Sequence, residues 1–178
     1  MVDLIFCYAV YNAEQTFRRS LESVKRFADR IVVVEGRFLE NPHGGSTRNS
    51  TDKTVKIARE FTDEVIISGD LPQHEQRDLY LLESKGGDYF FIIDADEVLR
   101  EMTQETKEDI LSGNCVVHGV WIFRGGKPEQ LCVRIFRQGF YTLHHCSGQC
   151  PLIDGKGRLM DGANYDVKVE TSFWLDHI

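Results

Sequence analysis

The segment Tyr89-Phe90-Phe91-Ile92-Ile93-Asp94-Ala95-Asp96-Glu97 joins five apolar residues directly to a cluster of three acids. The apolar run is typical of a strand that is buried on both faces, and we expect it to stop at Asp94. Three carboxylates within four residues repel one another unless a cation lies between them. Because carboxylate oxygens suit Mn²⁺ and Mg²⁺, we predict that Asp94 and Asp96 bind a divalent cation. Glu97 is expected instead to favour the first turn of a following helix.

Strands and helices alternate upstream of this segment. Alternation of this kind predicts an α/β domain of Rossmann type, with a mostly parallel central sheet, right-handed crossovers and flanking helices. Ligands of such sheets bind beyond the carboxyl ends of the strands, where the residues around Asn12, Glu35 and Asp94 would meet. The predicted strands are Val2–Val10, Arg30–Glu35, Val65–Ile67 and Tyr89–Ile93. Three helices are predicted: one after an Asn12 cap, one that begins at Thr51, and one over Gln73–Ser84 with Leu79 and Leu82 on one side.

The second half of the chain has a different pattern and is rich in predicted strands. After a helix near Thr103–Leu111, strands are expected at Val116–Phe123, Gln130–Arg137, Phe140–His144 and Val167–Trp174. The length of 178 residues suits one domain with a full core, so we expect residues 1–178 to fold as a single unit.

Charge and hydropathy exclude several classes of function. The net charge is -7, and an acidic chain lacks the clustered positive surface that nucleic-acid binding needs. The apolar run Leu4–Tyr11 is much shorter than the ~20 residues of a spanning helix, so we expect no transmembrane segment and a cytoplasmic protein. Five cysteines without a CxxC pair fit free thiols in a reducing compartment.

Four motifs, taken in order, resemble family 2 glycosyltransferases of the GT-A fold. They are Tyr11-Asn12-Ala13-Glu14, Ile31-Val32-Val33-Val34-Glu35, Ser50-Thr51-Asp52-Lys53-Thr54 and Asp94-Ala95-Asp96-Glu97. The resemblance covers residues 2–100 and implies a hexosyltransferase-type enzyme that uses Mn²⁺ or Mg²⁺ and usually inverts the sugar carbon. It implies a UDP- or GDP-sugar donor bound by residues 1–100, and residues 101–178 would then face a glycan, lipid or protein acceptor.

The resemblance also implies roles for individual residues. Glu35-Gly36 replaces the usual Asp-Ser, and the segment from there to Ser50 is longer than in the family. The identity of the nucleotide therefore stays open. Arg134-Ile135-Phe136-Arg137 resembles a segment that lines the site, and alternation along a strand places its two arginines on opposite faces. The implied donor-binding residues are Tyr11, Asn12, Glu35, Asp52, Arg77 and Asp94, and the implied metal ligands are Asp94, Asp96 and His177.

The catalytic base is not assigned by the resemblance, because the His-Glu pair that often follows the Arg-x-Phe-Arg segment is not evident. An inverting transfer needs a base within hydrogen-bond reach of the acceptor hydroxyl. Asp154 is the first candidate, ahead of Asp161 and Glu170. The alternative for Asp154 is structural, since Ile153-Asp154-Gly155-Lys156-Gly157 is a good turn sequence.

Other readings remain open at this point. The segment from Ile92 to Leu99 fits the opening motif of a haloacid-dehalogenase-type phosphatase with Asp94 as nucleophile, although that motif should open the fold. A non-catalytic module that binds a nucleotide sugar is the other alternative. His144-His145-Cys146 and Cys150 lack a standard zinc spacing and are better explained as core residues. Four aromatic residues form either a sugar-stacking wall or part of the core: Trp121, Phe123, Tyr141 and Trp174.

Overall fold

The computed structural model describes residues 2–40, 46–82, 88–138, 140–142, 152–154 and 167–178. The helices are α1 (Phe17–Val24), α2 (Thr54–Arg59), α3 (Gln73–Leu82) and α4 (Gln104–Leu111). The strands are β1 (Leu4–Val10), β2 (Arg30–Glu35), β3 (Val65–Ile67), β4 (Tyr89–Ile92), β5 (Glu97–Arg100), β6 (Val117–Arg124), β7 (Lys127–Arg137), β8 (Phe140–Thr142), β9 (Leu152–Asp154), β10 (Val167–Val169) and β11 (Trp174–His177).

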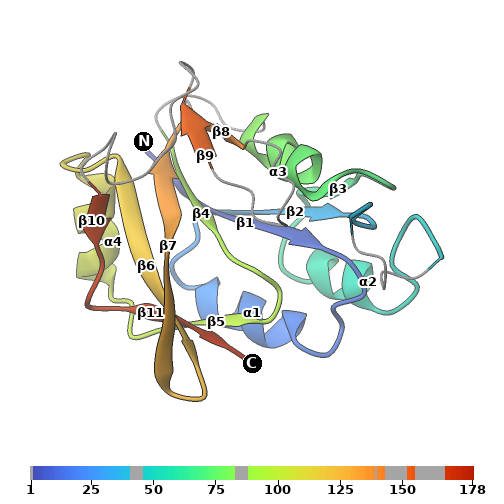
Figure 1. Ribbon diagram of the computed structural model, residues 1–178, viewed down its shortest axis with the longest axis horizontal. Coiled ribbons are helices and arrows are strands. Elements are labelled where there is room, and N and C mark those ends of the chain that lie inside the picture. The colour runs from blue at the N-terminus through green and yellow to red at the C-terminus, as the bar shows by residue number, and fades with distance from the viewer. Residues whose placement is uncertain (1, 41–45, 83–87, 139, 143–151, 155–166) are drawn as a thin grey trace.

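One mixed sheet runs through the molecule in the order β3-β2-β1-β4-β7-β6-β11-β5, with β10 also paired to β6 (Figure 1). Strands β1, β2, β3 and β4 are parallel, which confirms the prediction for the first half. The sheet is not mostly parallel beyond β4, because β7 runs antiparallel to both β4 and β6. A hairpin connection between β6 and β7 permits this direction, whereas parallel neighbours require a longer crossover.

Helices cover both faces of the sheet, and alternate residues of β1 show how the core divides. Phe6 and Tyr8 belong to one apolar cluster with Phe17 of α1, and that cluster also takes in residues of α2 and α4. Ile5 and Cys7 belong to a second cluster with residues of α3. This division follows from the two-residue period of a strand, and it explains why β1 is apolar throughout.

Two helices differ from the prediction. Helix α1 begins after Thr16, so Asn12 does not cap it. Asn12 instead has a positive φ of 47°, and its side chain accepts a hydrogen bond from the Thr51 amide. Asparagine tolerates this left-handed conformation better than most residues do. In α3 the buried positions include Tyr80 and Leu81, while Leu82 is 68% exposed. No helix within the described ranges combines the length and apolar character needed to cross a bilayer.

Strand β5 was not predicted, and it corrects the expectation for Glu97. Instead of opening a helix, Glu97 begins a strand that pairs antiparallel with β11, where His177 lies opposite Glu97. The predicted strand Val167–Trp174 is two strands, β10 and β11, and both pair with β6. This pairing brings the last strand of the chain beside the acidic segment that follows β4.

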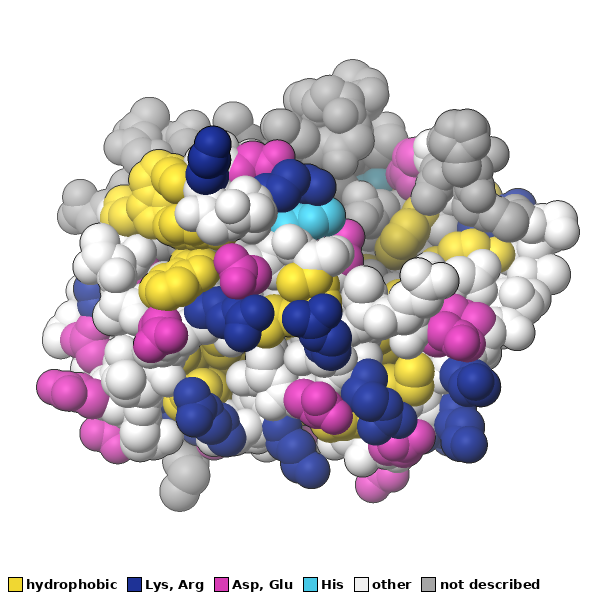
Figure 2. Space-filling view, turned by 90° about the horizontal axis from the view of Figure 1, so that it is seen from below, with side chains coloured by type: hydrophobic (Ala, Val, Ile, Leu, Met, Phe, Trp, Pro, Cys, Tyr) yellow, Lys and Arg dark blue, Asp and Glu magenta, His cyan; other side chains and the backbone are white. Residues whose placement is uncertain are grey.

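The surface around α1 and α2 carries charges of both signs. Figure 2, seen from below the view of Figure 1, shows basic and acidic side chains interspersed over this face. Arg18 on α1 and Glu60 beyond α2 form one such pair, with 2.6 Å between nitrogen and oxygen. Exposed pairs of this kind contribute little to stability and are typical of a solvated surface.

Candidate functional site

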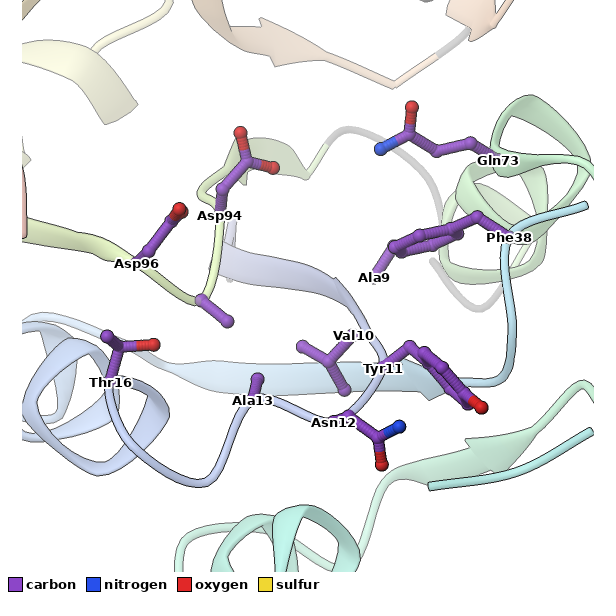
Figure 3. A pocket seen from close by; sticks show the side chains of 11 residues that line it. Ala9, Val10, Tyr11, Asn12, Ala13, Thr16, Phe38, Gln73, Asp94 and Asp96 are labelled. Atoms are coloured by element: carbon purple, nitrogen blue, oxygen red, sulfur yellow. The ribbon is translucent and has the colours of Figure 1, made fainter. Parts of the chain in front are cut away.

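The candidate site lies beyond the carboxyl ends of β1, β2 and β4, where the parallel strands all finish. A pocket of about 380 Å³ opens there. Figure 3 shows Asp94 and Asp96 on one side of this pocket and Tyr11 and Phe38 on the other, with the Gln73 side chain extending from α3. The convergence of strand ends that the sequence predicted therefore forms a pocket lined by acidic, aromatic and amide side chains.

Asp94 is held between two arginines from different elements. Its Oδ1 accepts a hydrogen bond from Arg77 Nη2 of α3 at 3.3 Å, and its Oδ2 accepts one from Arg134 Nη2 of β7 at 3.2 Å. Partial burial would raise the pKa of Asp94, but the Arg134 and Arg77 guanidinium groups outweigh it and hold the pKa below its ordinary value. Asp94 is therefore an ionised carboxylate whose orientation is fixed by both partners.

Arg134 reaches Asp94 because β7 is irregular at this residue. In the β6–β7 ladder His118 pairs with Ile135 and Gly119 pairs with Val133, so Arg134 is an extra residue without a partner on β6. A bulge of this kind bends the strand and redirects a side chain. Arg134 is 8% exposed and faces the acids.

Glu97 is a member of the site that sequence reasoning missed. Its Oε1 accepts a hydrogen bond from Arg134 Nη2 at 2.6 Å, and its Oε2 accepts one from the Asp94 amide at 2.9 Å. Burial raises the pKa of Glu97 to about 7, against the opposing effect of Arg134 and with a further rise from Asp94. Glu97 thus fixes both the Arg134 side chain and the backbone of Asp94. An acid beside two apolar residues, in Glu97-Val98-Leu99, was the available signal for a buried strand.

Asp96 and His177 form a second, more exposed contact beside the first. Asp96 Oδ2 lies 3.1 Å from His177 Nε2, and the two side chains are 44% and 28% exposed. The backbone holds them together, because the Ile178 amide donates to the Asp96 carbonyl at 2.8 Å. Two ligand atoms about 2.1 Å from an octahedral cation and at right angles to each other lie about 3 Å apart. The Asp96–His177 separation therefore fits a shared divalent cation.

The predicted three-residue metal set is assembled only in part. Among the described residues, no group of three His, Cys, Asp or Glu side chains converges as a metal cage. Asp94 bonds to arginines with both oxygens, whereas Asp96 and His177 remain beside the pocket. Mg²⁺ is usually held by one or two protein ligands together with substrate phosphates and water, and an Asp–His pair satisfies that requirement.

The loop after β1 interlocks with the segment before α2. Asp52 accepts hydrogen bonds from the Glu14 amide at 3.0 Å and the Thr54 amide at 2.9 Å. Burial would raise the pKa of Asp52, but a hydrogen bond from the Thr54 side chain, together with those from the Glu14 and Thr54 amides, holds the pKa below its ordinary value. Asn12 receives a hydrogen bond from Thr51, and the Tyr11 hydroxyl donates to the Thr47 carbonyl at 2.8 Å. Asp52 and Asn12 therefore shape the pocket wall through contacts within the protein.

Glu35 ends β2 and is 1% exposed. One carboxylate oxygen accepts a hydrogen bond from the Ser50 amide, and the other, Oε2, has no hydrogen-bond partner within the described part of the chain. A buried carboxylate oxygen without a donor is costly unless a ligand or water supplies one. The position beside the pocket and this unused acceptor are consistent with a contact to a polar ligand.

Several other predicted residues lie elsewhere or outside the described ranges. Asp154 belongs to β9, opposite Phe140, and its side chain is not among those described. Glu170 is buried and contacts His118 at 2.6 Å rather than facing the pocket acids. The rings of Phe123 and Trp174 pack with centroids 5.5 Å apart. Cys7, Cys115 and Cys132 are free thiols. Asp161, His144, His145, Cys146 and Cys150 lie outside the described residues.

No protein-family model matches this chain, and no curated protein matches it. Solved structures of S. aureus TarS are similar to it. TarS 1–349 aligns with a TM-score of 0.53 and 16% identity over 72% of this chain and 38% of that chain. The complex of TarS 1–349 with UDP-GlcNAc aligns with the same TM-score and identity, over 72% of this chain and 37% of that chain. The complex with UDP aligns with a TM-score of 0.52 and 17% identity, over 72% of this chain and 38% of that chain.

The chain therefore spans less than two fifths of each of these TarS 1–349 structures, and at this identity the likeness concerns the fold alone. It agrees with the observed topology, in which parallel strands carry the pocket and a half with both parallel and antiparallel pairs extends the sheet. The chain has a GT-A-like glycosyltransferase fold.

Proposed function

We propose that this chain is a glycosyltransferase that takes a sugar from a nucleotide-diphosphate donor. The observation that carries this proposal is the pocket edge itself. An ionised Asp94 lies between two arginines, and an Asp96–His177 pair with the spacing of two cation ligands lies beside it. The likeness to a protein whose structures contain UDP-GlcNAc and UDP adds support.

Asp96 and His177 would hold the Mn²⁺ or Mg²⁺ ion, with the donor's phosphates supplying further oxygens. When bound, such an ion neutralises the charge that develops on a departing nucleoside diphosphate. Carboxylate oxygen and imidazole nitrogen both suit Mn²⁺, which accepts this mixed ligand set. The Ile178–Asp96 backbone hydrogen bond keeps the two ligands together before the donor arrives.

Asp94 would orient the donor rather than serve as the principal metal ligand. Both of its oxygens already accept hydrogen bonds from Arg77 and Arg134, so its carboxylate is held rigidly at the pocket edge. A rigid acceptor suits hydrogen bonds to ribose hydroxyls, and a fixed geometry avoids an ordering cost on binding. The two arginines also place positive charge near the phosphates.

Glu35 would read the nucleobase. Its Oε2 is a buried acceptor without a partner in the described chain, so a donor N–H from the ligand would satisfy it. Uracil and guanine both carry a ring N–H, which is why UDP- and GDP-sugars are the proposed donors. Tyr11 and Asn12 would form the adjoining wall, and Asp52 would support that wall from behind through its bonds to backbone amides.

The transfer itself needs a base if the sugar carbon is inverted. Asp154 is the candidate for this role within the acceptor half, residues 101–178, which would receive a glycan, lipid or protein hydroxyl. The base would take the proton from that hydroxyl as its oxygen attacks the sugar carbon and the diphosphate leaves. Asp154→Asn should lower transfer while leaving donor binding unchanged.

Two alternatives differ from this proposal, one in the position of its aspartate pair in the fold and the other in whether it hydrolyses the donor. A haloacid-dehalogenase-type phosphatase places its aspartate pair on the first strand of the fold, whereas Asp94 follows the fourth strand of this chain. A module that binds nucleotide sugars without transfer would bind the donor and show no slow donor hydrolysis in the absence of acceptor. Release of free sugar from the donor therefore separates an enzyme from a binding module.

The proposal is tested by calorimetric titration of UDP and of GDP, each with Mn²⁺ and again with EDTA. We expect one nucleotide to bind with Mn²⁺ and to lose most of its affinity in EDTA, because the ion bridges the protein and the phosphates. Absence of binding by both nucleotides in the presence of Mn²⁺ would contradict the proposed function.

A further inference from the structure

The short segment that follows β2 is docked firmly on the segment that leads into α3. Phe38 and Leu71 form a parallel bridge. The Leu39 amide donates to the Leu71 carbonyl at 3.2 Å, and the Leu71 amide donates to the Arg37 carbonyl at 3.4 Å. Segment 37–39 is therefore held on the pocket rim by a single β-bridge at Phe38, after which the chain turns at Leu39. It lies in the stretch that is longer than in the resembling family.

Side chains reinforce this docking from both ends. Gln76 of α3 is fully buried, and its Nε2 donates to the carbonyls of Gly36 at 3.1 Å and Arg37 at 2.9 Å. The Glu40 carboxylate accepts a hydrogen bond from the Gln73 amide at 3.0 Å, at the first residue of α3. Fixing the backbone on both sides of Phe38 leaves its ring little freedom of position.

Phe38 and its neighbour Leu39 differ in their surroundings. Phe38 is half-buried and lines the pocket, where Figure 3 shows its ring directed inward from the segment after β2. Leu39 is 53% exposed. Tyr11 lies on the same side of the pocket as Phe38, and Asp94 and Asp96 lie across from them. The pocket thus has an aromatic end and an acidic end.

We propose that Phe38 is a nucleobase-binding residue whose ring stacks on the base of the bound nucleotide. This inference rests on the proposed function. The phosphates belong at the acidic end, where Asp96 and His177 lie, so an extended nucleotide places its base at the aromatic end. A preset aromatic ring binds a flat base at a low entropic cost. Stacking of a base on a protein aromatic ring is worth about 1–3 kcal/mol by alanine substitution.

The test compares Phe38→Ala with Leu39→Ala, its exposed neighbour that does not line the pocket, by calorimetry with Mn²⁺. The probes are UDP, GDP and inorganic pyrophosphate, which lacks a base. Phe38→Ala should weaken nucleotide binding at least about fivefold and leave pyrophosphate binding unchanged. Leu39→Ala should leave both unchanged. Phe38→Tyr should retain the nucleotide affinity of the wild type, because it keeps the ring.

Each possible result decides the inference. Unchanged nucleotide binding by Phe38→Ala would overturn the stacking role while leaving the proposed function in place. Equal losses for nucleotide and pyrophosphate would also overturn it, because Phe38 would then only organise the rim. If Phe38→Ala unfolds, the Phe38→Trp variant provides the test. The fluorescence of the added tryptophan should be quenched when the nucleotide binds, and unchanged emission would contradict stacking. A wild-type chain that binds neither nucleotide removes both proposals.

Discussion

Asp94 and Asp96 are two residues apart, yet they belong to regions of opposite character. Asp94 lies with Glu97, Arg77 and Arg134 in a cluster that is linked by hydrogen bonds between its members. Asp96 is 44% exposed, and its described side-chain partner is His177. The first region is built from β4, β5, β7 and α3, whereas the second is formed by the turn after β4 and by β11.

The difference shows how a short acidic motif can serve two purposes. Compensated buried charges hold a backbone segment in place, because removing any partner leaves an unpaired charge in the interior. A half-exposed carboxylate beside a histidine can exchange its partner for a cation without that penalty. We therefore propose a positioning role for the Asp94 region and metal binding for the Asp96 region, and the variants below separate the two.

The largest effect is expected from Arg134→Ala. It removes the shared partner of Glu97 and Asp94, so we expect a loss of about 3 kcal/mol in the free energy of unfolding at pH 8, measured with urea. Adding Glu97→Gln to this variant should restore part of the loss, because the two residues are coupled. Arg124→Ala removes an exposed arginine on β6 and should change stability little. Equal effects of the two arginine variants would refute the positioning role.

Asp96→Ala is expected to affect the ligand and not the fold. Removing the proposed charged ligand should weaken Mn²⁺-dependent nucleotide binding by roughly a hundredfold, because Asp96 would hold the ion that neutralises the phosphates. Its urea midpoint should match that of the wild type. Glu22→Ala, which deletes an exposed acid on α1, controls for the loss of one charge. Undiminished Mn²⁺-dependent binding by Asp96→Ala would rule out this residue as the metal ligand.

His177→Ala should have a smaller effect of the same kind. Loss of a neutral ligand should weaken Mn²⁺-dependent nucleotide binding by about tenfold, while binding in EDTA stays as it is in the wild type. Asp176→Ala changes the adjacent residue, which pairs with Arg100 rather than with the pocket, and should leave binding unchanged. Similar losses for both variants would indicate displacement of β11 and not the removal of a ligand.

Asp52→Asn is expected to cost about 1–3 kcal/mol of stability at pH 7, because the charged acceptor of two backbone amides is removed. The folded-state pKa of Asp52 lies below its ordinary value of 3.8, so its contribution is full above that value and is lost as pH falls through the folded pKa. The difference between wild type and Asp52→Asn in urea unfolding should therefore shrink in acid. A difference that is constant down to pH 3 would contradict this linkage.

The fold of the first half was predictable because its local and global signals agree. The apolar runs of β1, β2 and β4 are buried on both faces, and parallel pairing placed Asn12, Glu35 and Asp94 at one edge as expected. The second half was less predictable. Strand β5 has four residues, and its character depends on pairing with β11, which lies far away in sequence.

The site was predictable in its acids and less so in its partners. Arg134 lies at a bulge in the β6–β7 ladder, and a bulge has no reliable local signature in sequence. Glu97 looked like an exposed helix-start residue because the interior arginine that compensates it was not visible in the local sequence. Phe38 lies in a stretch that departs from the resembling family, and its place in the pocket depends on contacts with Leu71 and Gln76, which are far from it in sequence.

The central claim is that Asp96 and His177, and not the arginine-bound Asp94, are the protein ligands of the metal. Anomalous diffraction at the manganese edge from crystals grown with Mn²⁺ and UDP tests it most directly. We predict one manganese peak, within about 2.3 Å of both Asp96 Oδ2 and His177 Nε2, with the nucleotide phosphates completing the coordination. Two results would contradict the account. One is manganese bound to Asp94 while Asp96 and His177 stay in contact with each other, and the other is UDP bound without manganese.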